Sequence, residues 1–130
     1  MAVIPLLPRQ GMTLVLEHMR IARAHGMSRN MATALTYAWF YYKVKNHGLW
    51  DYKQHHPELQ NFGNFHYGAI GFAAGIPEKI LLMGAGFAQE HAGTSQIMWG
   101  HWYQQPPFGD DPHDQFWIKQ GIDYAKKVGY

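Results

Sequence analysis

Residues 110–128, DDPHDQFWIKQGIDYAKKV, predict an α-helix with the clearest start in the chain. Asp111 is a favoured N-cap residue, and Pro112 suits the first helical turn because its missing N–H has no helical partner there. Asp114 follows three residues after Asp111, where a carboxylate also assists the start of a helix. Aromatic and aliphatic side chains come next, so we expect the helix to continue to about Val128.

Four further helices are predicted from apolar residues that recur at helical spacing. They span residues 12–25, 29–45, 65–74 and 77–89. Gly26 and Gly75 follow two of these helices and offer C-terminal stops. Ser28 is the expected N-cap of the second helix, and Pro77 is the expected first residue of the fourth.

Residues 91–109 contain glycine, proline and aromatic side chains without a period, and we interpret them as a loop or lid. No stretch of any length alternates apolar and polar residues as a half-buried strand does. The predicted fold is therefore mostly α. Residues 1–130 are expected to form a single compact domain of about five helices with a long aromatic-rich loop.

The composition excludes several classes of protein. The chain has 130 residues, which suits one domain, and no cysteine, which excludes disulfides and thiolate metal sites. No apolar run is long enough to span a membrane. The N-terminal MAVIPLLPRQ has two prolines and no basic segment ahead of its apolar residues, so no signal peptide is expected.

Charge is distributed unevenly along the chain. Residues 1–46 carry six Arg or Lys and one Glu, a net charge of +5, whereas residues 47–130 carry a net charge of −3. Enzymes that act on nucleic acids usually surround their sites with cations, because neutralising phosphates supplies much of the affinity. The mildly acidic second part of the chain therefore argues against a DNA or RNA substrate if it bears the site.

Residues 50–68, WDYKQHHPELQNFGNFHYG, are the predicted wall of that site. Polar and ionisable side chains are interspersed here with aromatic rings, a setting that commonly shifts pKa values and supports chemistry. His66 is the leading candidate for an acid or base, because imidazole titrates near neutral pH. The structural alternative is a buried histidine that bonds one main-chain carbonyl. Asn64 would orient His66, bond a substrate or cap a helix.

Carboxylates and one lysine complete the catalytic candidates. Asp51 and Lys53 lie two residues apart, so in an extended loop they would form either a catalytic pair or a salt bridge. Asp110 is the freer candidate in its cluster, because Asp111 and Asp114 are explained by the helix start. Asp51 and Asp110 are the pair expected to act as the two carboxylates of glycosidic cleavage.

Aromatic rings are the predicted substrate-binding surface, since they stack on sugars, on bases or on a protein partner. The binding candidates are Trp50, Asn64, Tyr67, Trp99 and Trp102. No metal or cofactor site is predicted, because His55, His56 and Glu58 lack the spacing of a helical zinc motif. Phosphate-binding glycine loops and serine-nucleophile elbows are likewise missing from the sequence.

Four blocks in order, WFYYKVKNHGLWDYK, FGNFHYGAIGFAAGI, LLMGAGFAQ and FGDDPHDQFWIKQGIDY, resemble the polymorphic toxin type 44 family. The resemblance covers about residues 37–127, and residues 1–29 have no counterpart in it. Its best-matching blocks include residues 50–53, 64, 66–68 and 110–112. It implies an antibacterial toxin module, carried by Rhs-type or other secreted bacterial proteins, with a cognate immunity protein as partner.

Three functions remain open at this stage. The leading one is a peptidoglycan hydrolase that acts in the periplasm of a target bacterium, with Asp51 or Asp110 and His66 as acid and base. The second is a metal-independent nuclease acting in the cytoplasm, with His66 as base and Lys53 stabilising the phosphorane. The third is a helical module without enzymatic activity that binds a partner or perturbs a membrane.

Overall fold

The computed structural model describes residues 2–8, 10–26, 32–45, 50 and 59–130. These residues form five α-helices, one short 3-10 helix and no strand. The elements are α1 (Gly11–Gly26), α2 (Ala34–Val44), α4 (Gln60–Ala73), α5 (Glu78–His91), η2 (Ile97–Trp99) and α6 (Pro112–Lys127). The predicted mostly α fold, with a long loop between its last two helices, is confirmed.

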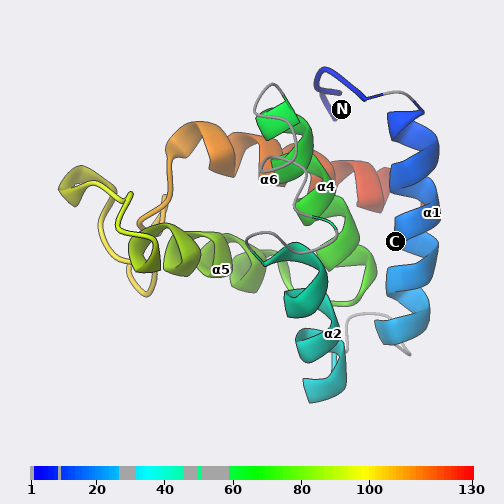
Figure 1. The fold of residues 1–130 in the computed structure, drawn as a ribbon, viewed down its shortest axis with the longest axis horizontal. Helices are drawn as coiled ribbons and strands as arrows, with labels where there is room; N and C mark the ends of the chain where they lie inside the picture. Colours follow the sequence, from blue (N-terminus) through cyan, green and yellow to red (C-terminus); the bar gives the residue numbers. More distant parts are fainter. Residues whose placement is uncertain (1, 9, 27–31, 46–49, 51–58) are drawn as a thin grey trace.

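Helix α4 lies at the centre of the molecule, with α1 and α5 on opposite sides, and α6 crosses it and ends beside α1 (Figure 1). Its Phe62, Phe65 and Ile70 side chains are fully buried. The most extensive contact is with α6, and glycines make it possible. A Cβ atom on Gly68 would lie 2.1 Å from the carbonyl oxygen of Ile118, so the two helix backbones approach too closely for a side chain.

Helix α1 belongs to this core. Its Val15, Met19 and Ala22 side chains are fully buried, and the helix packs against α4. The C-terminal end of the chain returns to α1, where the Arg23 guanidinium lies 5.2 Å from the Tyr130 ring centroid. The N-terminal helix is thus part of the fold rather than an appendage, because its apolar stripe covers one face of α4.

Two helix starts differ from the prediction. Helix α2 begins at Ala34 and not near Arg29, because Thr33 and Thr36 form a capping box that satisfies the first N–H groups. The predicted cap Ser28 lies outside the described residues. Helix α4 begins at Gln60, five residues before the expected Phe65, since the polar residues at its start are accommodated on a helix face that meets α6.

Helices α5 and α6 follow the prediction closely. Pro77 is the N-cap of α5 rather than its first helical residue. Asp111 caps α6 as predicted, accepting a hydrogen bond of 2.9 Å from the His113 N–H. Asp114 lies in the first turn of α6, as predicted, and its buried side chain also accepts hydrogen bonds from amide groups of α4. In the described part of the chain, no helix is long and apolar enough to cross a membrane.

Candidate active site

Two histidines from distant parts of the chain meet where α1 packs against α4. His18 Nδ1 lies 2.8 Å from His66 Nε2. His66 is fully buried, while 9% of His18 is exposed. His18 shares the inward face of α1 with Val15 and Met19, and this helix face meets the side of α4 that carries His66. Of the two imidazoles, only His18 retains any exposed surface.

Aromatic rings extend this pair into a continuous row. The Trp50 ring stacks on His18 with centroids 3.9 Å apart and planes inclined by 14°. Trp39 of α2 meets Trp50 edge-on at 5.5 Å and stacks in turn on His25 at 4.1 Å. The row restrains the orientation of the His18 ring, because stacking on Trp50 leaves that ring little freedom to rotate.

Burial keeps both imidazoles neutral at pH 7. The pKa of His66 lies well below its ordinary value, mainly because burial penalises the charged ring and secondly because His18 is close. The pKa of His18 is lowered to about 4, mainly by burial and secondly by the nearby Lys43 ammonium group. A neutral pair needs one ring to donate the bond and the other to accept it.

The cation beside the pair comes from α2. Lys43 Nζ lies 5.1 Å from the Trp50 ring centroid. The main-chain N–H of Trp50 donates a 2.7 Å hydrogen bond to the main-chain carbonyl oxygen of Lys43. The sequence from His18 to Trp50 contains no Asp or Glu, but five Arg or Lys. The fold therefore brings His18 and Lys43, two residues of the basic N-terminal part, close to His66.

A second polar cluster lies on the opposite side of α4, against α6. Asp114 Oδ1 accepts hydrogen bonds from Asn64 Nδ2 at 3.0 Å and from Gln60 Nε2 at 3.1 Å. Asp110 is also buried, and its Oδ2 accepts a 2.7 Å hydrogen bond from Gln115 Nε2. These bonds tie the start of α6 to α4 and supply the donors that a buried carboxylate needs.

The structure separates several of the predicted site residues. His66 and Trp50 lie together as predicted. Asn64 does not orient His66, because it points to the α6 side of its helix and bonds Asp114. Tyr67 donates a 2.7 Å hydrogen bond to the Leu81 carbonyl oxygen, and burial, with the charge of Asp110 second, raises its pKa well above the ordinary value. Asp51 and Lys53 lie outside the described residues.

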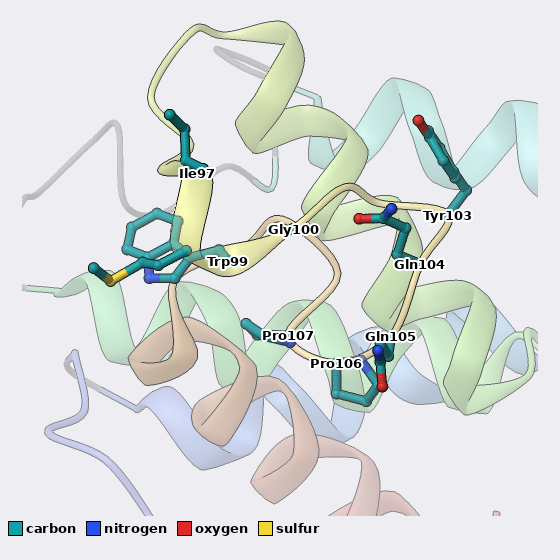
Figure 2. Close-up of a pocket in the computed structure, with 9 residues that line it drawn as sticks. Ile97, Trp99, Gly100, Tyr103, Gln104, Gln105, Pro106 and Pro107 are labelled. Atoms are coloured by element: carbon teal, nitrogen blue, oxygen red, sulfur yellow. The ribbon is translucent and has the colours of Figure 1, made fainter.

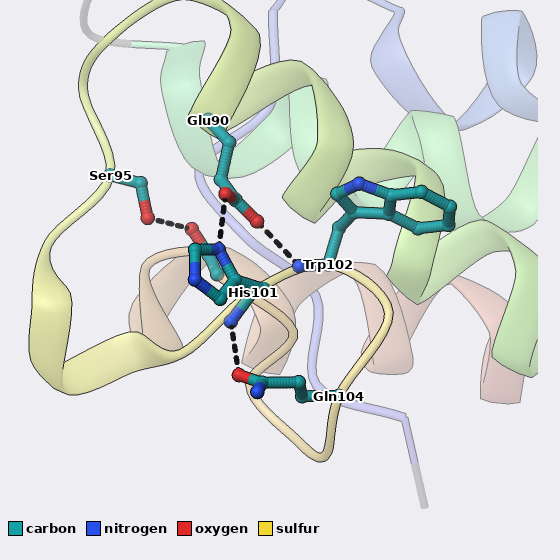
Figure 3. Close-up of polar contacts among 6 residues, drawn as sticks. Glu90, Ser95, His101, Trp102 and Gln104 are labelled. Atoms are coloured by element: carbon teal, nitrogen blue, oxygen red, sulfur yellow. Dashed lines mark hydrogen bonds and ion pairs between the residues drawn. The ribbon is translucent and has the colours of Figure 1, made fainter.

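Trp99 and Trp102 belong to the loop between α5 and α6, at the end of the molecule away from α1 (Figure 1). Glu90 holds this loop: its carboxylate accepts from the Trp102 N–H and lies 2.8 Å from His101 Nδ1 (Figure 3). The His101 bond is the main reason why the pKa of Glu90 is lowered. The Trp102 ring meets Phe87 edge-on at 5.5 Å.

The same loop forms an open surface pocket of about 550 Å³, called the hollow below. It is lined by residues between Ile97 and Pro107, Trp99 among them (Figure 2). The lining contains aliphatic, aromatic, amide and phenol groups. It contains no carboxylate, imidazole or cation, so the hollow offers a binding surface without an acid–base pair. We therefore take the His18–His66 pair, and not the hollow, as the candidate active site.

Sequence reasoning did not identify His18 and Lys43. One feature of the sequence could have singled out His18: it lies on the apolar stripe of its helix, four residues after Leu14 and three after Val15. Lys43 had no comparable local feature. Among the described residues, no group of three or more carboxylate or imidazole side chains is arranged to hold a metal ion.

Comparison with known proteins gives the family. The family model for bacterial toxin 44 matches residues 19–127, and the chain therefore belongs to that family. The match begins inside α1, so it includes more of the N-terminal part than the sequence blocks had indicated. No curated protein and no solved structure matches the chain. The chain is thus a bacterial toxin domain in which α1, α2 and α4 together form the candidate active site.

Proposed function

We propose that this member of the bacterial toxin 44 family is an antibacterial nuclease that cleaves RNA, with His18 as the base and His66 as the positioning residue. One observation carries the proposal: a neutral imidazole pair lies near the Lys43 ammonium group, whose effect on the pKa of His18 exceeds that of the Glu17 carboxylate. Neutral imidazole is the form that accepts a proton, and cations are what a phosphodiester requires nearby.

The geometry assigns a role to each ring nitrogen. His18 bonds His66 through Nδ1, and the proposal assigns the proton transfer to the other ring nitrogen, Nε2. In the corresponding tautomer the His18 Nδ1–H donates to His66 Nε2, and His18 Nε2 carries the lone pair. His66 thus has the orienting role that a third residue has in catalytic triads, and its burial keeps the pair aligned.

The chemical step balances without a further reactant. His18 Nε2 takes the proton of a ribose 2′-hydroxyl while the 2′-oxygen forms a bond to phosphorus. The bond from phosphorus to the 5′-oxygen breaks, and the leaving oxygen takes a proton from solvent. The products are a 2′,3′-cyclic phosphate and a 5′-hydroxyl. DNA has no 2′-hydroxyl and is left intact.

Lys43 is the group that stabilises the negative charge of the reacting phosphate. Its ammonium lies over Trp50, which itself stacks on His18, so the cation is close to the base. The same charge disfavours protonation of His18 and helps keep the base neutral. An RNA substrate places the site of action in the cytoplasm of a target bacterium. A cognate immunity protein in the producing cell is the corresponding partner.

A peptidoglycan hydrolase is the second candidate. Asp110 favours the hydrolase. Its carboxylate is buried beside Tyr67 and accepts a hydrogen bond from the Gln115 amide, a setting found around catalytic acids. Cleavage of a glycosidic bond requires a second carboxylate at a defined separation, and Asp51 is the partner suggested by the sequence. This candidate places the substrate in the periplasm.

Toxicity in a bacterial host, with and without a periplasmic export signal, separates the two candidates. The nuclease kills without export, and the purified chain releases fragments with 2′,3′-cyclic phosphate ends from RNA while DNA stays intact. His18→Gln should remove cleavage. His66→Gln should lower kcat more than it raises KM, since it disturbs the orientation of the base and not substrate binding.

His91→Gln is the matched control, because His91 is exposed on α5 and lies outside the pair. It should retain toxicity and RNA cleavage. Killing that requires export, with RNA left intact by the purified chain, contradicts the nuclease. That result, together with muropeptide fragments that disappear in Asp110→Asn, supports the hydrolase.

A further inference from the structure

The outward face of α2 exposes large side chains that the fold does not need. Tyr41 and Tyr42 are 64% and 68% exposed, and Leu35 is 82% exposed. The same helix packs inward through Phe40 and Thr36, which are buried. Tyrosine rings left in water contribute nothing to the core, so their presence on one short surface indicates a contact with another molecule.

A cation completes this surface. Lys45 Nζ lies 4.6 Å from the Tyr42 ring centroid and 6.0 Å from the Tyr41 centroid. The two rings are 6.4 Å apart, with their planes inclined by 72°. A positive charge between two exposed rings matches a molecule that has both negative charge and flat apolar faces.

The charge pattern selects a polyanion. No Asp or Glu occurs from His18 to Trp50, so no carboxylate from this part of the chain opposes Lys45 or Lys43. Lys43 lies on the same helix, one and two residues from the exposed tyrosines, and reaches the Trp50 ring beside His18. Helix α2 therefore carries both the exposed tyrosines and the lysine that lies near the proposed reaction centre.

We infer that Tyr41, Tyr42 and Lys45 form a subsite for unpaired bases of the RNA strand that His18 cleaves. This inference rests on the proposed function and narrows its substrate to single-stranded RNA. Bases of a duplex already stack on one another, whereas unpaired bases offer free faces to a tyrosine ring. Because every base has such a face, the subsite accepts any base.

Binding tests the subsite without depending on cleavage. The full chain with His18→Gln, which does not cleave, is titrated into a fluorescein-labelled single-stranded oligouridine of about twelve nucleotides, and anisotropy is measured. The double variant Tyr41→Ala/Tyr42→Ala should bind about thirtyfold more weakly or worse, since each of the two stacked bases contributes about 1–3 kcal/mol. A duplex of the same length should bind more weakly and should not respond to the double variant.

Two further variants make the result specific. Tyr103→Ala removes a tyrosine that is 59% exposed on the distant loop, and affinity should not change. Lys45→Gln should lower the slope of log affinity against log salt by about 0.7, the value for one phosphate contact on a single strand. Circular dichroism should show the same helix content for the His18→Gln protein and for the variants made in it, since Tyr41, Tyr42, Lys45 and Tyr103 are all exposed.

Cleavage provides a second test. With His18 intact, the tyrosine double variant should raise KM for the long strand and leave kcat unchanged. A dinucleotide, which spans only the bond at His18, should be cleaved equally well by both proteins. The inference is supported by this difference between long and short substrates.

Several outcomes overturn the inference. Unchanged oligouridine affinity in the double variant removes the subsite while leaving the proposed nuclease intact. If inorganic polyphosphate displaces the oligouridine equally well from the parent protein and from the tyrosine double variant, binding depends on charge alone and not on base stacking. Tyrosine-dependent binding to vesicles with anionic lipid, without binding to oligouridine, assigns it to membranes. If wild-type protein cleaves no RNA yet binds it through the tyrosines, the proposed function fails and the subsite stands.

Discussion

Acid should destabilise this protein through the His18–His66 pair. In the native state both imidazoles have lowered pKa values, about 4 for His18 and well below the ordinary value for His66. In the unfolded chain each ring returns to an ordinary pKa near 6.5 and takes up a proton as the pH falls below that value. The unfolded state then binds more protons than the native state, so the free energy of unfolding decreases as pH decreases.

The magnitude follows from this difference. Between about pH 7.5 and about pH 5, a ring that stays neutral in the native state lowers the free energy of unfolding by about 2 kcal/mol. The two rings together give an upper limit of about 4 kcal/mol, and the partial exposure of His18 reduces its share. Such a loss is a large fraction of the stability of an ordinary domain. Stability should not change above about pH 7.5 for this reason.

Urea unfolding followed by circular dichroism measures the effect, with the free energy extrapolated to water at each pH. The range stops at about pH 5 because buried carboxylates such as Asp110 add their own titration below it. The apolar double variant His18→Phe/His66→Leu should lose most of the pH dependence. His91→Gln, an exposed histidine on α5, should keep it. A wild-type change below about 0.5 kcal/mol would refute the reasoning, as would full pH dependence in the apolar variant.

Three further predictions concern the packing around the site. Gly121→Ala places a Cβ atom 1.9 Å from the Phe65 carbonyl oxygen and should lower the free energy of unfolding by about 1–3 kcal/mol or more, whereas Lys119→Ala on the exposed side of α6 should change it little. Asp114→Asn removes the charged acceptor of the buried Asn64 amide and of the exposed Gln60 amide and should cost about 1–3 kcal/mol, measured by urea unfolding; an unchanged midpoint contradicts this. Glu90→Gln releases the loop between α5 and α6, so chymotrypsin should cleave that loop faster while the thermal midpoint and RNA cleavage stay near wild type. Equal cleavage rates in wild type and variant would show that Glu90 does not hold the loop.

Local chemistry explains which helices were predicted well. The start of α6 needs only Asp111 and Pro112, whose cap and fixed φ act within one turn, and the sequence places both correctly. The start of α2 was placed too early because the Thr33–Thr36 capping box is as local but was not recognised. The start of α4 depends on Asp114, more than forty residues away, and no local pattern reveals that partner.

The candidate site shows the same division. The sequence assigned His66 and Trp50 to one candidate segment because ionisable groups are set among rings there, and in the structure their ring centroids lie 5.5 Å apart. Asn64 was assigned to His66 from its separation of two residues. On a helix, residues two apart do not face each other, and so the two side chains serve opposite sides of α4.

By itself, the sequence determined the helical class, the cap of the last helix and the uneven charge, all of which follow from composition and short-range pattern. Only the tertiary structure shows that His66 contacts His18, a residue 48 positions earlier, and that Lys43 lies over the Trp50 ring next to this pair. The reason is that spacing along a chain specifies which side chains share a helix face. Which faces then pack together depends on long-range burial, here on the close crossing of α4 and α6 that turns the other side of α4 toward α1.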